Sequence, residues 1–232
     1  MKLQLGAVLV AIAICVAPVK ADILINEFSP NPDGTDPTTQ TIELIATMGE
    51  TSFSGFYGSI EGDGSFSIDR DGAINVTFDA NGLATFDIPD LENPTFTLYI
   101  SSDDHSGAAG IGDITTALDA LGVPDNNSDT LYGATLGGTD LVNHDTAGFD
   151  NEPVLVFRDS LSSDWIAMYE DDPGTSSFFA FDAAGIQVDN SLFSPDPAVS
   201  TFGGINPARI PEPTSIVVLG AIALGAISRR RK

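Results

Sequence analysis

Two short apolar segments near the start of the chain decide its predicted fold: ILINEF at Ile23–Phe28 and TIELI at Thr41–Ile45. Both segments are rich in β-branched and aliphatic residues, which favour strands. The residues between them, Ser29–Thr39, are rich in Pro, Gly and Asp, which are typical of turns. The sequence therefore predicts two strands joined by a loop.

Short strands of the same kind are predicted along most of the chain. Thr95–Ile100 alternates polar and apolar residues, which predicts a central strand with Phe96, Leu98 and Ile100 on one face. Asp79–Gly82 has the composition of a tight turn and predicts a hairpin between the strands on either side. Further strands are predicted at Ser65–Ile68, Ala73–Phe78, Leu83–Ile88, Leu131–Ala134, Pro153–Phe157, Asp164–Tyr169, Ser177–Phe181 and Ile186–Asp189.

One short helix is predicted after the central strand. The apolar residues between Ile114 and Leu121 recur at helical spacing, and Asp113 is suited to the N-cap. Gly122 would end the helix and Pro124 would prevent it from continuing. Many short strands with one small helix predict an all-β sandwich.

The pattern I-N-E-F, a loop and I-E-L, between Ile25 and Leu44, resembles the start of the lamin-tail domain. That family is an immunoglobulin-like β-sandwich found in lamins and in many exported bacterial proteins. The resemblance implies that these residues form the first two strands and that their acidic side chains are mostly structural. We therefore expect an immunoglobulin-like β-sandwich with one short helix over residues 22–193, followed by a Pro- and Gly-containing linker over residues 194–210.

The last part of the chain, residues 211–232, combines three features in a fixed order. Pro211, Glu212 and Pro213 form a stiff, extended tripeptide. A nearly continuous apolar stretch follows, for which we expect a transmembrane helix at residues 214–228. Arg229, Arg230, Arg231 and Lys232 then place four positive charges at the end, which should stay on the cytoplasmic side of a membrane.

This order resembles the sorting signal of the PEP-CTERM family of bacterial surface proteins, and Pro211–Pro213 matches that motif position for position. The resemblance implies processing near the motif by exosortase, a membrane-embedded cysteine protease or transpeptidase. The apolar stretch Thr214–Ile227 would span roughly 21 Å as a helix, against a hydrocarbon core of ~30 Å. A short, temporary anchor suits a segment that is to be removed, although an ordinary tail anchor is the alternative.

The N-terminal segment, residues 1–21, has the pattern of a secretory signal peptide. A lysine precedes an apolar run at Leu5–Val16, and Val19 and Ala21 are small residues at the positions before a cleavage site after Ala21. Cys15 is the single cysteine of the chain and lies within this segment. The exported part should therefore contain no disulfide and no cysteine-bound metal.

Charge is divided sharply between the ends and the middle of the chain. Residues 22–210 contain three basic residues, Arg70, Arg158 and Arg209, against 32 acidic ones, a balance of about −29. Such a surface excludes nucleic acid and anionic lipid as partners of this part, because no basic patch can neutralise phosphate. Cations and neutral polysaccharide remain possible partners.

Acidic residues in turns provide weak candidates for a Ca²⁺ site: Asp69 and Asp71 in Ser67–Gly72, and the pair Asp103 and Asp104. Ser67–Gly72 begins like a calcium loop, but the twelfth position is Phe78 instead of a carboxylate, so a turn between strands is the simpler interpretation. No other cofactor is expected.

Catalytic signatures are sparse. His105 and His144 are the two imidazoles of the chain, and no G-x-S-x-G nucleophile motif is present. Abundant aspartates neither indicate nor exclude glycoside hydrolysis. Trp165 alternates with residues suited to a core strand.

The sequence thus predicts a non-enzymatic bacterial protein that is exported, anchored at least transiently in the membrane, and sorted to the cell surface or extracellular matrix for a structural or adhesive role. Two alternatives remain open: a Ca²⁺-dependent carbohydrate- or protein-binding module, and a secreted hydrolase.

Overall fold

The computed structural model describes residues 23–32, 37–91, 95–144, 152–171 and 177–210, and these residues form an all-β protein. The strands are β1 (Ile23–Phe28), β2 (Thr39–Ala46), β3 (Ser52–Glu61), β4 (Ile68–Thr77), β5 (Leu83–Pro89), β6 (Phe96–Ser101), β7 (Ala117–Val123), β8 (Thr139–Asp140), β9 (Leu155–Arg158), β10 (Trp165–Glu170), β11 (Phe178–Asp182), β12 (Gln187–Val188), β13 (Phe193–Ser194) and β14 (Ala208–Arg209). Within the described ranges, helical geometry is limited to the 3₁₀ turns η1 (Ile111–Asp113) and η3 (Asn190–Leu192).

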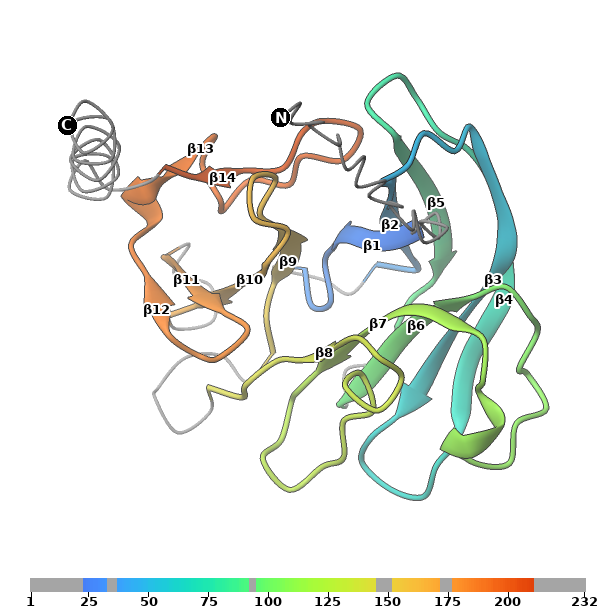
Figure 1. Ribbon diagram of the computed structural model, residues 1–232. Helices are drawn as coiled ribbons and strands as arrows, with labels where there is room; N and C mark the ends of the chain where they lie inside the picture. The colour runs from blue at the N-terminus through green and yellow to red at the C-terminus, as the bar shows by residue number, and fades with distance from the viewer. Residues whose placement is uncertain (1–22, 33–36, 92–94, 145–151, 172–176, 211–232) are drawn as a thin grey trace, which may run out of the picture.

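The strands form two large sheets and one small one (Figure 1). The first has seven strands in the order β12-β11-β10-β9-β1-β2-β5, and the second has five in the order β4-β3-β6-β7-β8. β13 and β14 pair with each other. Neighbouring strands are antiparallel except for β7 and β8, which are parallel. The two predicted segments at the start of the chain are β1 and β2, and they pair as neighbours.

The main core contains side chains from both large sheets. Ile25 and Ile42 of the seven-stranded sheet and Leu98, Ile100 and Leu121 of the five-stranded sheet belong to one cluster, and each is 0% exposed. Each such side chain contributes about 1.5–3 kcal/mol through burial. A core shared between two sheets is consistent with a β-sandwich.

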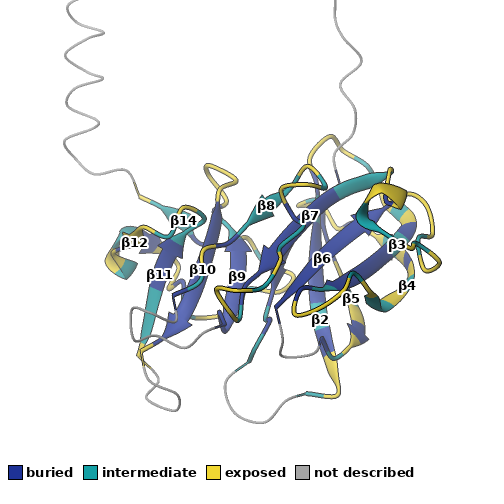
Figure 2. Ribbon diagram, turned by 90° about the horizontal axis from the view of Figure 1, so that it is seen from below, coloured by how far each residue is buried: buried dark blue, intermediate teal, exposed yellow. Residues whose placement is uncertain are grey.

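The predicted central strand is confirmed. β6 lies in the middle of the five-stranded sheet, and Phe96, Leu98 and Ile100 all face the shared core. The opposite face of the same strand is also buried, because Tyr99 packs in a second cluster with Ile60 and with loop residues. Figure 2 shows that inner strands such as β6, β9 and β10 are largely buried, whereas the edge strands β4 and β5 also carry exposed residues.

The predicted helix between Ile114 and Leu121 is wrong. Its second half belongs to strand β7, which pairs with β6 on one side and with β8 on the other. Leu121 lies in the main core, and Ala120 packs on the opposite face in the second cluster, with Tyr99 and Ile60. Because both faces of β7 are buried, its apolar residues do not recur at every second position as in a half-exposed strand. Asp113 still acts as a local cap, because its Oδ2 accepts hydrogen bonds from the backbone N–H groups of residues 109 and 110.

The predicted hairpin around Asp79–Gly82 is also wrong, although the turn itself is present. Asp79 Oδ1 accepts from the backbone N–H groups of Asn81 and Leu83, each at 2.8 Å, and Gly82 has a φ of +77°. The flanking strands belong to different sheets: β4 pairs with β3, and β5 pairs with β2. The turn therefore carries the chain from one sheet to the other.

The strand predicted at Leu131–Ala134 is replaced by a loop and turns. The backbone N–H of Tyr132 donates to the Thr97 side chain at 2.9 Å, so a hydroxyl satisfies a group that a neighbouring strand would otherwise pair. The four strands predicted between Pro153 and Asp189 are confirmed as β9–β12, with small differences at their ends.

Candidate functional site

The segment predicted as a linker, residues 194–210, is part of the folded domain. It runs back across the seven-stranded sheet, next to β9, β1 and β2 (Figure 1), and its end pairs with β13 through β14. We call residues 201–209 the C-terminal strap. A linker would leave its backbone in water, whereas the strap is hydrogen-bonded to side chains of the domain. The linker prediction is therefore wrong for these residues.

Two buried glutamates hold the beginning of the strap. Glu27 accepts hydrogen bonds from the backbone N–H of Thr201 at 2.8 Å and from its hydroxyl at 2.6 Å. Glu43 accepts one from the backbone N–H of Gly203 at 2.6 Å. The two glutamates are 1% and 0% exposed and belong to the INEF and IEL patterns of β1 and β2. Charged acceptors of this kind form the stronger class of hydrogen bonds in proteins.

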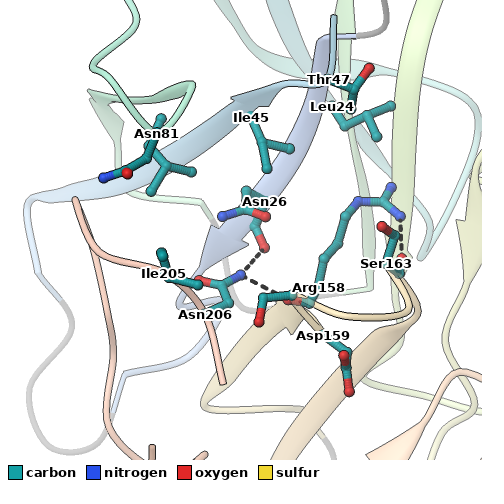
Figure 3. A pocket seen from close by; sticks show the side chains of 12 residues that line it. Leu24, Asn26, Ile45, Thr47, Asn81, Arg158, Asp159, Ser163, Ile205 and Asn206 are labelled. Carbon is teal, nitrogen blue, oxygen red and sulfur yellow. Dashed lines mark hydrogen bonds between the residues drawn. The ribbon is translucent and has the colours of Figure 1, made fainter. Parts of the chain in front are cut away.

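The second half of the strap is held by amide and carboxylate groups. Asn206 donates to the backbone carbonyls of Asn26, at 3.1 Å, and of Arg158, at 3.0 Å, and Figure 3 shows it between these two residues. The backbone N–H of Arg209 donates to Asp159 Oδ2 at 2.8 Å. The strap thus joins β1 to the end of β9, where the two strands pair over only two residues.

Burial changes the acidity of one of the glutamates. Loss of hydration raises the pKa of Glu43 from about 4.5 to about 6, and the hydrogen bonds from Gly203 and Asn26 oppose this rise. The negative charges of Glu27 and Asp79 raise it further. The carboxylates of Glu27 and Glu43 accept hydrogen bonds from the strap and from Asn26. These two side chains therefore hold the strap in place.

A buried ion pair connects the two large sheets beside the strap. Arg158 Nη2 of β9 lies 2.8 Å from Asp119 Oδ2 of β7, with side-chain exposures of 14% and 6%. The same arginine donates through Nε to the carbonyl of Ile25 at 2.8 Å, and the same carboxylate oxygen accepts from the N–H of Ile25 at 2.9 Å. The guanidinium lies 4.3 Å from the ring centroid of Trp165, within cation–π range. We call this group the cross-sheet pin.

The strap also borders a hollow of about 260 Å³ (Figure 3). Its walls include the aliphatic side chains of Leu24, Ile45, Leu83 and Ile205. Asn26 and Asn206 line it as well, and their polar groups already bond within the protein. A site of this composition suits an aliphatic group more than an ion.

The weak Ca²⁺ candidates do not form one site. Asp69 and Asp71 lie in β4 and not in a turn, which corrects the interpretation of Ser67–Gly72, and Asp69 pairs with Arg70. Asp103 and Asp104 lie in the loop after β6. Among the described residues no group of three or more potential metal-binding side chains comes together.

One aspartate from each predicted pair does influence the same tyrosine. Burial raises the pKa of Tyr99 to about 12, and the charges of Asp71 and Asp104 add to this rise. Two carboxylates are too few for Ca²⁺, which takes six to eight oxygen ligands.

The two histidines have separate surroundings. His144 is buried against Phe181, with ring centroids 3.9 Å apart, and burial lowers the pKa of its imidazole. His105 Nε2 lies 3.3 Å from the hydroxyl of Thr116, but within the described part of the chain its Nδ1 has no hydrogen-bond partner. A Ser–His–Asp type of triad needs a carboxylate at that position. Trp165 is 2% exposed, so it is a core residue, as its alternation suggested.

The predicted targeting residues lie outside the described residues. These are Ala21 at the expected cleavage site, Pro211, Glu212 and Pro213, and the basic end Arg229, Arg230, Arg231 and Lys232. Among the residues that are described, no helix is both long and apolar enough to cross a membrane.

Neither the strap nor the pin is predicted from the sequence. One signal was available: Arg158 and Arg209 are two of only three basic residues in a strongly acidic domain. A basic side chain in such an acidic domain is expected to form a specific ion pair, as Arg158 does with Asp119.

No protein-family model matches the chain, and neither a curated protein nor a solved structure is significantly similar to it. The resemblances to the lamin-tail domain and to the PEP-CTERM signal therefore stay predictions. The function has to be inferred from the residues of this chain.

Proposed function

We propose that the chain is an exported, non-enzymatic bacterial protein that a PEP-CTERM-type tail sorts to the cell surface or extracellular matrix, where it has a structural or adhesive role. The observation that carries this proposal is the order of the last residues: Pro211–Pro213, an apolar stretch, and the basic end at Arg229–Lys232. Exosortase is the proposed processing enzyme, and residues 1–21 are the proposed signal peptide.

The way the domain ends supports a removable tail. The backbone N–H of Ile210 donates to the carbonyl of Leu192 at 2.6 Å, and the proposed sorting motif begins at the next residue. The contacts that hold the strap all lie before this point, from Thr201 to Arg209. A cut after residue 210 would leave these contacts intact, so the domain can stay folded once the tail is removed.

The positions of the INEF and IEL residues support a lamin-tail-like, immunoglobulin-like sandwich. The resemblance implies that the acidic residues of these patterns are structural. Glu27 and Glu43 are buried and bind backbone groups of the strap. Their use as internal acceptors agrees with a structural role.

The charge of the domain favours neutral partners at the proposed location. Its balance of about −29 repels nucleic acid and anionic lipid, and neutral extracellular polysaccharide remains compatible with it. The separate surroundings of the two histidines give no support to a hydrolase, and the dispersed aspartates give none to a Ca²⁺-dependent module.

The sorting proposal is tested by replacing Pro211, Glu212 and Pro213 with alanine in the native host. The matched control replaces Asp63, Gly64 and Ser65, three exposed residues that also include one carboxylate. We expect the variant to keep its C-terminal tail and remain with the membrane fraction, while the control loses its tail and is delivered like the wild type.

Processing and surface delivery that are unchanged in the variant would refute the sorting proposal. A wild-type protein that keeps its tail and stays in the membrane would show that the tail is an ordinary anchor.

A further inference from the structure

A second hollow, of about 430 Å³, lies next to the cross-sheet pin. It is bordered by β8 of the five-stranded sheet and by β9, β10, the end of β11 and the strap. Its lining includes Arg158, Arg209, Trp165, Asp164, Asp182 and Thr139. The volume falls in the range of small-molecule sites. Two of the three arginines of the domain therefore border one hollow.

Arg209 has no polar partner for its side chain among the described residues. Its backbone N–H bonds to Asp159, but its Nε is buried without an acceptor. Its guanidinium lies 5.8 Å from the ring of Phe193. By contrast, Arg70 and Arg158 each make ion pairs and hydrogen bonds. An arginine whose side chain has no polar partner among the described residues of so acidic a domain can bind an acceptor on a ligand.

Trp165 contributes a second donor without an acceptor. It is 2% exposed, yet its Nε1 has no hydrogen-bond partner in the described part of the protein. Leaving a buried donor unsatisfied is unfavourable, and buried polar groups in native proteins are nearly always paired. Arg158 covers the face of the ring, and Nε1 itself is buried, so a ligand in the hollow would reach this donor through a small shift of the surrounding side chains.

The same lining offers acceptors that are not fully used. Asp182 accepts two backbone hydrogen bonds through Oδ1, which leaves Oδ2 available. Asp164 and the hydroxyl of Thr139 also border the hollow. Because Arg158 is already paired with Asp119, Arg209 is the cation of the lining that faces Asp164 and Asp182, and the hollow offers both donors and acceptors.

We propose that this hollow binds the hydroxyl groups of a neutral saccharide. Hydroxyls both donate and accept, so they can pair with the Arg209 and Trp165 donors and with the Asp164 and Asp182 carboxylates at the same time. An anion would be repelled by the acidic domain, and a cation would meet the Arg209 guanidinium. The proposal rests on the adhesive role proposed above and names the class of ligand for it.

The single tryptophan of the chain provides a direct test. The full chain in detergent micelles, labelled with ¹⁵N-tryptophan, gives one indole N–H resonance, from Trp165 Nε1. We expect glucose, mannose, galactose or their neutral disaccharides to shift this resonance in a saturable way. Arg209→Gln should weaken the binding about tenfold or more, because a charged hydrogen bond is lost. Arg70→Gln, in β4, is the matched control and should bind like the wild type.

Three results would overturn the proposal: no saturable shift with any neutral sugar, binding unchanged by Arg209→Gln, or a shift with glucuronate or glycine and none with neutral sugars. The titration uses purified protein, and its outcome is independent of the PEP-motif variant, which is followed in cells. Loss of sugar binding and failure of sorting are therefore distinguishable.

Discussion

Removing Arg158 from the cross-sheet pin is expected to destabilise the protein far more than removing a surface arginine. In Arg158→Gln, the Asp119 carboxylate stays buried, at 6% side-chain exposure, without its ion-pair partner. The carbonyl of Ile25 also loses the donor that Arg158 Nε supplies. Breaking a buried pair in this way costs about 3–5 kcal/mol. For a domain of this size, the loss corresponds to a fall in Tm of roughly 6–20 °C.

The assay is thermal unfolding of the full chain in detergent, followed by circular dichroism at neutral pH. Arg70→Gln is the control, because Arg70 and Asp69 form the other arginine–aspartate pair and are 27% and 20% exposed. Such a pair contributes about 1 kcal/mol or less. Adding Asp119→Asn to Arg158→Gln removes the unpaired charge and should restore part of the stability. A Tm loss for Arg158→Gln no larger than that of the control would refute the energetic role assigned to the pin.

Four further outcomes are expected. Because the folded pKa of Glu43, about 6, lies above its usual value of about 4.5, this group binds more protons in the folded state between these values. The contribution of Glu43 to stability is therefore largest below pH 4.5 and declines as the pH rises to 6. Glu43→Gln should remove this part of the pH dependence of Tm. If Tm changes with pH in the variant as it does in the wild type, the raised pKa of Glu43 is not its cause. A chain ending at Ser200 should lose cooperative melting, because the buried glutamates lose their strap donors, whereas a chain ending at Ile210 should melt like the wild-type domain. Gly58→Ala should lower stability by about 1–3 kcal/mol, because its Cβ would lie 2.4 Å from the hydroxyl oxygen of a buried tyrosine, while Gly64→Ala, with open space around it, should be neutral in the same denaturant titration. Millimolar Ca²⁺, compared with EDTA, should leave Tm unchanged; a rise of several degrees would contradict the dispersed placement of the acidic loops.

The sequence predicts the strands well where polar and apolar residues alternate or where turn residues mark their ends. Ile23–Phe28, Thr41–Ile45 and Thr95–Ile100 are examples, and each is a strand in the structure. The sequence does not predict β7, because its residues do not alternate between polar and apolar, and the spacing of the apolar residues in Ile114–Leu121 also fits a helix. Around Asp79–Gly82, the local turn was predicted, but the pairing depends on partners far along the chain, which local residues do not encode.

The candidate sites were less accessible from sequence than the strands. The resemblance to the lamin-tail domain implies that the acidic side chains of Ile25–Leu44 are structural. The partners of Glu27 and Glu43, however, are Thr201 and Gly203, which lie in a segment whose Pro and Gly content indicates a linker. The composition of a segment indicates how flexible the segment is in isolation. It does not show whether hydrogen-bond acceptors from distant parts of the chain will bind that segment in the folded protein. The lack of a polar partner for the Arg209 side chain among the described residues likewise depends on where distant segments lie in the fold, which the sequence does not show.

The strap also determines when the domain can finish folding. Glu27 lies in the first strand and Thr201 lies 174 residues later, so these two groups cannot meet until almost the whole domain has been synthesised. Contacts over such long separations form slowly, and chains that depend on them stay incompletely folded for longer. If the protein is exported as proposed, its first strand reaches the far side of the membrane well before the strap that completes it. The chain would thus cross the membrane before it can reach its native structure. Folding would be completed only after residue 209, at the end of the strap, has been exported as well.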